Sequence, residues 1–298
     1  MNKLIFVDID GTLTPAGTNV PPDSALLAIR KAQQAGNRVL LCTGRNVDML
    51  KPLLKYGFDG IIGSSGGYVA VRIPEEEKDR DAAGTYVETL PDVEGYYRVL
   101  YDHPISREQQ EIAVTTLHNN GVFCTIEGKT GSFGDENLKD FLDGTEGGNS
   151  EIERWRKALA GNLGIKPMSQ YDGQPIYKVV MMARDLSQFD ECRALLEKDF
   201  QFVLQDVPAH GCVNGELVNR AFDKGKGCVR AAEYYHVPMS DTYGFGDSMN
   251  DLEMILAVGT SVCMENGSPA LKEKCKLICP AVTDDGLYKA FDQLGLFA

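Results

Sequence analysis

Two aspartates, Asp8 and Asp10, follow directly after the short apolar run of residues 3–7. A continuous run of this length indicates a strand buried on both faces, as in a parallel sheet. Ligands of open parallel sheets bind at the carboxyl ends of the strands, so both carboxylates would lie where a ligand binds. The two would repel each other unless a cation lay between them, and Mg²⁺ fits because it takes oxygen ligands, commonly carboxylates together with a substrate phosphate. A solvated acidic turn is the alternative interpretation.

Two nearby turns could bind an anion. Gly11 permits a tight turn, and Thr12 offers a hydroxyl and an amide. The triplet Thr43-Gly44-Arg45 follows a second apolar run, residues 38–42, and places a hydroxyl and an approachable backbone at the start of a helix. Each turn, taken alone, is equally typical of an ordinary strand-to-helix connection.

Two later segments add acidic and basic groups. Asp247 follows another apolar run and could supply a third metal ligand from a second strand end. Asn250 and Asp251 open a helix, where they are also typical of an N-cap and of an acid that complements the helix dipole. Lys224 and Lys226 form a basic pair in an acidic protein, and a solvated surface pair is the alternative.

The elements that must position these residues alternate between strand and helix at both ends of the chain, which predicts a parallel α/β sheet. We expect strands at 3–7, 38–42, 60–63, 242–245, 260–264 and 277–279, with helices at 23–35, 47–55, 227–236, 251–258, 268–276 and 286–294. Between them we expect strands at 85–90, 121–127, 177–183 and 202–205, helices at 106–119, 151–163 and 186–199, and a surface loop at 128–150.

The charged run 75–81 is typical of a solvated linker and is a natural domain hinge. We therefore predict a discontinuous α/β core made of residues 1–81 and 212–298. Residues 82–211 would form a large α+β domain inserted into that core. The length of 298 residues also suits two domains.

Composition excludes several function classes. The chain has 30 basic and 43 acidic residues, and its net charge of −13 disfavours binding to nucleic acid or to an anionic membrane. No apolar run is long enough to span a bilayer, and the N-terminus lacks the pattern of a secretory signal. The eight cysteines contain no C-x-x-C pair, which favours reduced thiols in a cytoplasmic protein. Oligomeric state is not predicted.

Together the segments D-x-D-G-T, T-G-R, K-G and G-D-x-x-N-D occur in the order and at the strand ends typical of one family. The chain resembles the haloacid dehalogenase (HAD) superfamily of phosphotransferases over its whole length. The large insertion is similar to the cap of the Cof-type branch, whose members are mostly phosphatases of small metabolites and sugar phosphates. The resemblance implies a Rossmann-like core with an α+β cap hinged over the site.

The resemblance also implies residue roles. Asp8 would be the nucleophile that forms an aspartyl-phosphate, and Asp10 the general acid and base. Thr43 would bind the transferring phosphoryl group. Lys226 would neutralise charge, because the Lys226-Gly227 step directly precedes the helix, and Lys224 would be a solvated neighbour. Mg²⁺ would be held by Asp8, the backbone carbonyl of Asp10 and Asp247, with Asp251 orienting the site. Substrate contacts would come from Gly11, Thr12, Thr43, Gly44, Arg45, Lys226 and Asn250.

Some features depart from the pattern or leave alternatives open. Residues 64–67, Ser-Ser-Gly-Gly, stand where the Cof-type branch often has Asn-Gly, so any contact of that Asn is in doubt. Tyr177 and Lys178 resemble a Tyr-Lys pair frequent in the branch, although a solvated strand face is the alternative. The D-G-T-L-T-P segment also resembles eukaryotic-type phosphomannomutases. We therefore predict an Mg²⁺-dependent phosphatase of a small phosphorylated metabolite, with a phosphomutase or a non-catalytic phosphometabolite-binding protein as alternatives.

Overall fold

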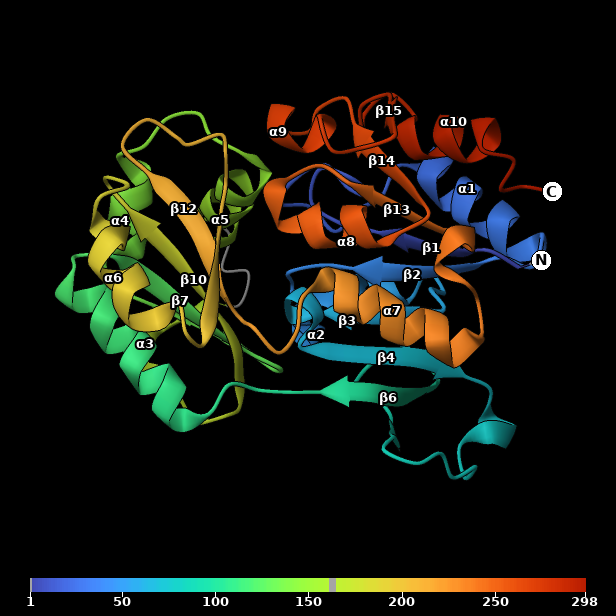
Figure 1. Cartoon of the computed structure of the whole chain (residues 1–298), viewed down its shortest axis with the longest axis horizontal. Coiled ribbons are helices and arrows are strands. Elements are labelled where there is room, and N and C mark those ends of the chain that lie inside the picture. The colour runs from blue at the N-terminus through green and yellow to red at the C-terminus, as the bar shows by residue number, and fades with distance from the viewer. Residues whose placement is uncertain (1, 161–164) are drawn as a thin grey trace.

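The computed structural model describes residues 2–160 and 165–298, and it consists of two lobes, each built on its own β-sheet (Figure 1). The core sheet has nine strands in the order β15-β14-β13-β1-β2-β3-β4-β6-β5. The strands from β15 to β3 run parallel, and β4, β6 and β5 are antiparallel additions at one edge. Their bounds are β1 Leu4–Val7, β2 Arg38–Cys42, β3 Gly60–Gly63, β4 Tyr68–Ile73, β5 Tyr86–Glu88, β6 Tyr96–Asp102, β13 Thr242–Gly246, β14 Thr260–Met264 and β15 Leu277–Cys279.

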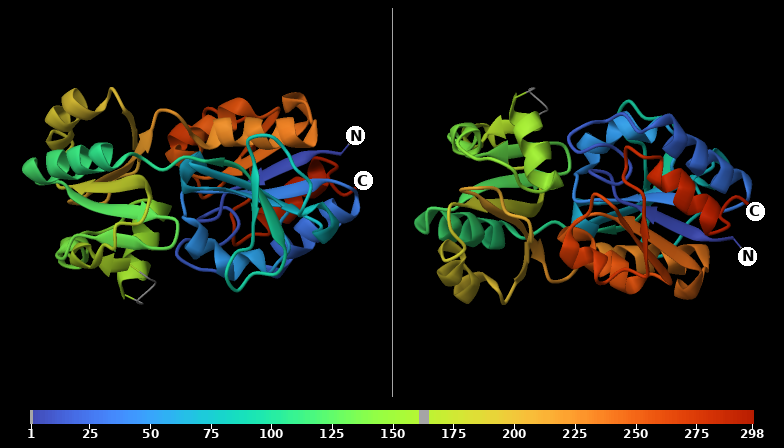
Figure 2. Two further views of the ribbon diagram at one scale, coloured as in Figure 1. Left: turned by 90° about the horizontal axis from the view of Figure 1, so that it is seen from below. Right: turned by 90° about the horizontal axis from the view of Figure 1, so that it is seen from above.

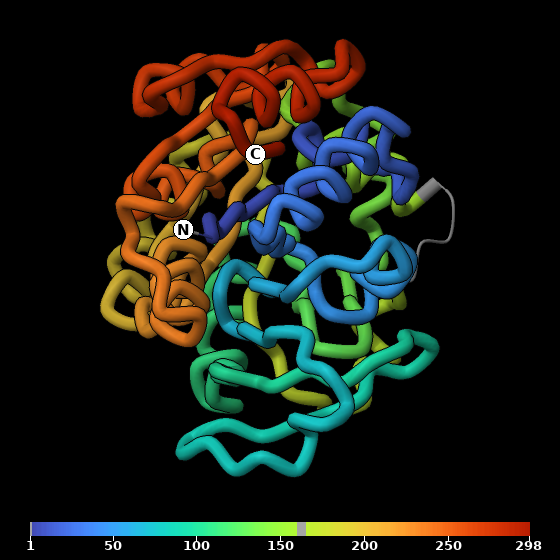
Figure 3. Tube along the Cα trace, turned by 90° about the vertical axis from the view of Figure 1, so that its right-hand side faces the viewer, coloured from blue at the N-terminus to red at the C-terminus, as the bar shows by residue number. Residues whose placement is uncertain are grey.

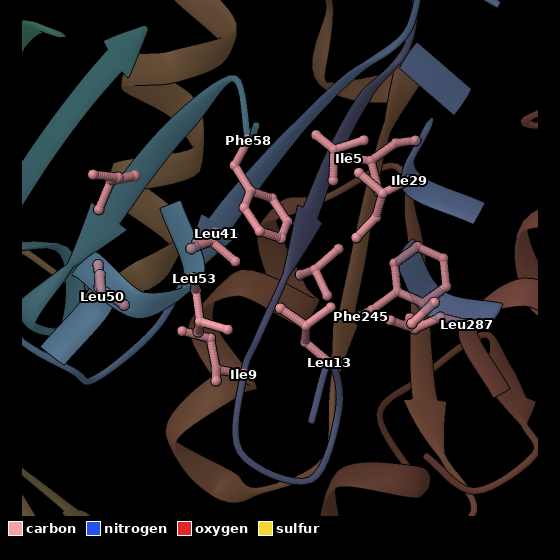
Figure 4. Packing of buried hydrophobic residues seen from close by; sticks show 14 of the residues in the cluster. Ile5, Ile9, Leu13, Ile29, Leu41, Leu50, Leu53, Phe58, Phe245 and Leu287 are labelled. Atoms are coloured by element: carbon pink, nitrogen blue, oxygen red, sulfur yellow. The ribbon is translucent and has the colours of Figure 1, made fainter. Parts of the chain in front are cut away.

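Helices cover both faces of the core sheet, which is why its central strands are apolar throughout (Figure 2). Side chains alternate between the faces of a strand, so Ile5 and Val7 of β1 join one apolar cluster and Leu4 and Phe6 join the other. Figure 4 shows the first cluster, in which Ile29 and Leu287 pack from helices onto the strands. That face carries α1 (Asp23–Gln34), α2 (Val47–Leu54) and α10 (Gly286–Gln293), and the other carries α7 (Lys224–Tyr235) and α8 (Leu252–Ala257), with the short α9 (Pro269–Lys272) beside β14.

The second lobe, the cap, is built on a six-stranded sheet in the order β11-β12-β10-β7-β8-β9. Its central strand β10 is buried along its whole length because both faces are covered. One face packs against α3 and α6 and the other against α4 and α5. Bounds are α3 Arg107–Asn119, β7 Phe123–Gly128, β8 Ser132–Gly134, α4 Leu138–Asp143, α5 Ser150–Ala160, β9 Ile165–Pro167, β10 Ile176–Ala183, α6 Gln188–Leu196, β11 Phe200–Leu204 and β12 Val213–Asn219.

The α/β fold class that the sequence predicts is confirmed, and the domain boundaries at 81/82 and 211/212 are corrected. Strand β6 belongs to the core sheet because it pairs with β4, so the chain enters the cap after Asp102. Strand β12 belongs to the cap sheet because it pairs with β10 and β11, so the chain leaves the cap after Asn219. The charged run 75–81 lies in the β4–β5 connection of the core and is not the hinge.

Several predicted elements change in detail. The segment 128–150, expected as loop, contains β8 and α4. The helix expected at 151–163 is α5, Ser150–Ala160, and residues 161–163 of that prediction lie outside the described residues. In the described ranges, no helix combines the length and the apolar character needed to cross a membrane. Both chain ends lie at the end of the core that is farthest from the cap. Figure 3 shows the molecule with this end toward the viewer.

Candidate active site

Most of the predicted site residues, though not Lys226, meet at the carboxyl ends of three adjacent core strands, β13, β1 and β2. Asp247 follows β13, Asp8 follows β1 and Thr43 follows β2. The chain proceeds from β1 to β2 and β3 on one side, whereas β13 to β15 lie on the other. Such a reversal of strand order opens a crevice at the strand ends, which is where open α/β sheets bind ligands.

The loop after β1 is fixed by its backbone and by two buried apolar side chains. Asp8 N donates to Phe245 O at 3.0 Å, which ties the start of the loop to β13. The side chains of Ile9 and Leu13 are buried in the apolar core and anchor the loop to it (Figure 4). Gly11 has φ +90°, and a Cβ there would lie 2.5 Å from Asp247 Oδ2. Only glycine therefore lets this loop pass so close to Asp247.

The lysine beside Asp8 is Lys224, and the prediction for Lys226 is wrong. Lys224 Nζ donates to Asp8 Oδ1 at 2.8 Å and to Asp251, and it lies 3.4 Å from Asn250 Oδ1. The Lys226 side chain is 47% exposed and donates instead to the Arg220 carbonyl at 2.7 Å.

The physical reason is the start of α7. Asp223 caps this helix by accepting the Lys226 amide at 2.7 Å, so Lys224 is already the first helical residue. Two helical steps turn the chain by about 200°, so side chains two residues apart point to opposite sides of a helix. An extended chain would have placed both lysines on one side, and a helix admits only one of them to the site.

Asp251 and Asn250 lie where the sequence predicts them, next to the lysine. Asp251 is fully buried, and its Oδ2 accepts the amides of Asp247 at 3.0 Å and Ser248 at 3.2 Å. Asn250 Oδ1 accepts the Ser248 hydroxyl at 2.9 Å. These bonds fix the turn after β13 and hold Asp251 against Lys224.

Three carboxylates form a cluster suited to a divalent cation. Asp8, Asp247 and Asp251 each offer an oxygen, and the three atoms lie within 4.8 Å of one another. Burial, and then repulsion from Asp251, raise the pKa of Asp8 well above its usual range. Burial, Asp251 and Asp8 raise the pKa of Asp247 in the same way. The negative charge of these carboxylates is therefore not fully balanced by nearby positive charge. A bound cation would balance it.

The Asp10 carboxylate points away from this cluster and forms a buried ion pair with Arg45. Arg45 Nε and Nη2 donate to its two oxygens at 2.7 and 2.6 Å, and the Gly17 amide adds a third bond at 3.0 Å. Burial opposes ionisation of Asp10, but Arg45 and Arg154 outweigh burial and lower its pKa. Arg45, predicted to bind substrate, is thus engaged by Asp10 and also by Asn19 at 2.5 Å.

Thr43, Gly44 and Thr12 line the site at the strand ends. Thr43 Oγ accepts the Arg45 amide at 3.1 Å, which leaves its hydroxyl proton free to donate. Thr12 Oγ lies 3.3 Å from Asp247 Oδ1, so it positions the Asp247 carboxylate. Gly44 lies under the cap, because a Cβ there would be 2.8 Å from Lys178 Nζ.

The cap contributes charged side chains over the site, of which the sequence analysis named Lys178 and missed Glu127 and Glu216. Lys178 of β10 is fully buried rather than solvated, and it pairs with Glu216 and lies 3.3 Å from Glu127 Oε2. Neither carboxylate oxygen of Glu127 makes a well-aligned hydrogen bond to a described residue, and burial raises the pKa of Glu127 despite Lys178. The sequence did contain a signal for burial of Lys178, because it is the one charged residue in the otherwise largely apolar strand β10.

Helix α5 of the cap also contacts the catalytic loops. Ser150 Oγ donates to Asp247 Oδ2 at 2.9 Å. One helical turn on, Arg154 Nε lies 3.8 Å from Asp10 Oδ2 while its guanidinium also binds Glu151. Both contacts come from one face of α5, so this helix closes the cap onto the core.

The Ser-Ser-Gly-Gly turn after β3 also contacts the cap. The backbone of Ser64 and Ser65 has φ of 49° and 57°, a left-handed conformation that residues other than glycine rarely adopt. This strain directs Ser65 Oγ to Glu216 Oε2 at 2.9 Å. At the position where the Cof-type branch often has an asparagine, Ser65 therefore makes a hydrogen bond to the cap residue Glu216.

The fold and site define an α/β enzyme with a buried lysine and a cluster of three buried aspartates beneath a cap. The chain belongs to the haloacid dehalogenase-like hydrolase family, whose profile matches residues 5–291. It is a phosphatase of the Cof-type branch.

Curated relatives and solved structures agree over nearly the whole chain. The 5-amino-6-(5-phospho-D-ribitylamino)uracil phosphatase YwtE of Bacillus subtilis is 26% identical, with 98% of each chain covered. The HMP-PP phosphatase of Yersinia pseudotuberculosis is 24% identical, covering 92% of this chain and 88% of the relative. The sugar phosphatase BT4131 has a similar fold, with TM-score 0.73 and 18% identity, covering 99% of this chain and 100% of that one.

Proposed function

We propose that this phosphatase hydrolyses a small phosphorylated metabolite, depends on Mg²⁺ and forms an aspartyl-phosphate on Asp8. The observation that carries the proposal is the set of groups around Asp8, which is buried at the end of β1. The Lys224 ammonium lies 2.8 Å away, and oxygens of Asp247 and Asp251 lie within 4.8 Å. A nucleophile, a cation and an acidic cluster are the groups that phosphoryl transfer through a covalent intermediate requires.

The carboxylates of Asp8 and Asp247, with the backbone carbonyl of Asp10, would hold the Mg²⁺. Asp251 is less available as a direct ligand, because Lys224 and two backbone amides occupy its oxygens. The raised pKa values of Asp8 and Asp247 support this assignment, since burial and neighbouring carboxylates outweigh the positive charge that Lys224 brings to Asp8. When bound, the ion would neutralise charge on the phosphoryl group.

In the first step, an Asp8 oxygen would attack phosphorus while the bond from phosphorus to the leaving oxygen breaks. Asp10 would protonate that leaving oxygen and later take a proton from the water that attacks phosphorus. That attack would break the bond between the Asp8 oxygen and phosphorus, release inorganic phosphate and regenerate the Asp8 carboxylate. Arg45 holds Asp10 ionised, which is the form that the second step requires. The first step requires a protonated Asp10, so we expect substrate binding to loosen this ion pair.

The remaining core residues would bind the phosphoryl group. The free hydroxyl proton of Thr43 and the Gly44 amide would donate to its oxygens. Lys224 would neutralise charge shared between Asp8 and the phosphoryl group, with Asn250 beside it. Positioned donors of this kind are the main source of rate in phosphoryl transfer.

The cap would bind the leaving group. Glu127 offers two buried oxygens without well-aligned donors, so it suits a leaving group that carries hydroxyl or amine donors. Arg154 adds a buried cation 3.8 Å from Asp10. We therefore propose a polyhydroxylated leaving group such as a sugar or a polyol. The names of YwtE and BT4131, which refer to a phosphoribityl compound and to sugar phosphates, support this class.

Substrate access requires the cap to open, because Lys178 and Glu216 occupy the space over Gly44. Opening and closing would exclude bulk water during the reaction. Small phosphorylated molecules are the partners that we propose, and the cysteine pattern favours the reducing cytoplasm as the location.

The test is a phosphate-release screen of sugar, polyol and nucleoside monophosphates with and without Mg²⁺ after EDTA treatment. We expect Mg²⁺-dependent turnover, with hydroxylated leaving groups preferred over p-nitrophenyl phosphate in kcat/KM. Asp8→Asn is the matched inactive control. Full activity after EDTA treatment would contradict the metal assignment. Transfer of phosphate between two positions of one sugar without its release would favour the phosphomutase alternative, and binding without turnover would favour the non-catalytic one.

A further inference from the structure

A second group of potential metal ligands lies in the cap, on elements that supply none of the site residues at the ends of β13, β1 and β2. His118 is near the end of α3, Cys124 is the second residue of β7, and Asp135 directly follows β8. Each residue offers one ligand atom, and the three atoms lie within 4.8 Å of one another. They are an imidazole nitrogen, a thiol sulfur and a carboxylate oxygen.

The distances show that the three side chains converge on one point. His118 Nε2 lies 2.9 Å from Asp135 Oδ1 and 3.4 Å from Cys124 Sγ. A proton relay from cysteine through histidine to aspartate would use two different ring nitrogens. Here one nitrogen faces both partners, so the arrangement does not fit a catalytic triad.

The same distances are close to those of a tetrahedral metal centre. With metal–ligand bonds of about 2.0–2.3 Å, a tetrahedral Zn²⁺ holds its nitrogen, sulfur and oxygen ligands about 3.3–3.6 Å apart. The sulfur–nitrogen distance of 3.4 Å already matches that range, and the nitrogen–oxygen distance of 2.9 Å needs only a small expansion. A thiolate with an imidazole selects Zn²⁺ and similar transition metals over Mg²⁺.

Backbone hydrogen bonds hold two of the ligands in place. Asp135 Oδ2 accepts the Cys124 amide at 2.7 Å, and the Asp135 amide donates to the Cys124 carbonyl at 3.1 Å. These bonds direct the other oxygen, Oδ1, toward His118. Fixed outer contacts of this kind orient metal ligands and raise affinity.

The surroundings provide access and a fourth position. A cavity of about 380 Å³ lies beside the cluster and is lined by His118, Asp135, Glu136 and Asn137 among others. Water or a polar side chain could complete the coordination from that side. Cys124 is buried, and burial together with Asp135 raises the pKa of its thiol, so metal binding would release a proton.

We propose that His118, Cys124 and Asp135 form a site for a thiophilic divalent cation of the Zn²⁺ class, separate from the Mg²⁺ centre at Asp8. The bound ion would tie the end of α3 to β7 and to the segment after β8. Because the unfolded chain lacks this arrangement, binding would stabilise the cap.

The test is a titration of the metal-free, full-length protein with Co²⁺, which reports thiolate ligation by a near-ultraviolet charge-transfer band. We expect one such band, removable by Zn²⁺. The band should be absent in Cys124→Ser, which lacks the sulfur ligand, and it should need at least about 100-fold more Co²⁺ in His118→Asn, since losing even an outer contact costs 10- to 100-fold. His118 is 43% exposed, so its variant keeps the test valid if Cys124→Ser unfolds.

Controls separate this site from the rest of the protein. Cys275→Ser removes the thiol that is not fully buried and should leave the band unchanged. Asp247→Asn weakens the proposed Mg²⁺ centre, whose ligands are oxygens, and should also leave it unchanged. The proposal is overturned if wild type gives no thiolate band, if His118→Asn gives the band at the same Co²⁺ concentration as wild type, if Cys124→Ser keeps the band, or if Cys275→Ser abolishes it.

Discussion

Replacing Lys224 should abolish most activity, whereas replacing Lys226 should not. Lys224→Ala removes the ammonium that lies 2.8 Å from Asp8 Oδ1 and also binds Asp251. Removing one preorganised donor to a developing charge costs about 3–4 kcal/mol, or about 10²–10³ in kcat. Lys224 serves both the nucleophile and the phosphoryl group, so we expect a loss of at least that size.

The neighbouring lysine is a matched control. Lys226 is solvated, and among the residues that the structure describes its ammonium contacts the Arg220 carbonyl and Asp223, the second at 3.2 Å. Surface substitutions of this kind usually change stability by less than about 0.5 kcal/mol. Lys226→Ala should therefore keep kcat/KM within about threefold of wild type.

The assay is kcat/KM for p-nitrophenyl phosphate in saturating Mg²⁺, combined with a thermal unfolding curve for each variant. Breaking a buried ion pair from one side costs about 3–5 kcal/mol of stability, so activity must be compared below the transition of Lys224→Ala. Lys224→Met keeps the stem of the side chain and separates lost charge from lost packing. Equal losses in the Lys224 and Lys226 variants, with both proteins folded, would refute the placement of the lysine.

Three further results are expected. Asp8→Asn should lower turnover at least about 10⁴-fold, the scale of losing a nucleophile, and retained turnover would contradict the assignment. The metal-free variant should melt at or above the temperature of wild type, because the substitution removes a buried charge and its repulsion with Asp251. Glu127→Gln should lower kcat/KM about 10- to 100-fold for hydroxylated substrates, the value of a charged hydrogen bond, but leave p-nitrophenyl phosphate unchanged; a uniform loss would argue against a leaving-group contact. Because the pKa of Glu127 is raised above 4.5, its stabilising effect is present below that pH and is lost as pH rises through the folded pKa. Unfolding curves should thus show Glu127→Gln gaining stability relative to wild type between pH 4.5 and neutrality, and a constant difference would show that Glu127 titrates normally.

Local patterns were sufficient to predict the core and most of the catalytic loops. The apolar runs that became β1, β2, β13 and β14 are buried on both faces, so each carries a strong signal within four or five residues. Asp8, Thr43 and Asp247 follow those strands directly, and the parallel order brings them together. Their meeting therefore needed no knowledge of side-chain contacts.

The errors arose where long-range pairing or a helix start decides the outcome. The predicted domain boundaries put β6 in the cap and β12 in the core, and only the pairing of these strands with β4 and β10 assigns each to its lobe. The choice between Lys224 and Lys226 depended on whether Asp223 ends the loop, because this cap starts the helix at Lys224, three residues before the predicted start at 227. The positions of Glu127 and Arg154 near the site depend on how the cap packs against the core. A short stretch of sequence carries no information about that packing.

The division of labour between the lobes has an evolutionary consequence. The groups proposed for bond making lie on core loops, and those proposed for the leaving group lie on cap strands and on α5. With these proposed roles, mutations at Glu127 or Arg154 would change which substrate is preferred and would leave the core groups Asp8 and Lys224 in place. Gly44 is the exception, because its missing side chain leaves room for Lys178 of the cap. A lineage of such enzymes could diversify its substrates through the cap while position 44 stays under constraint from both lobes.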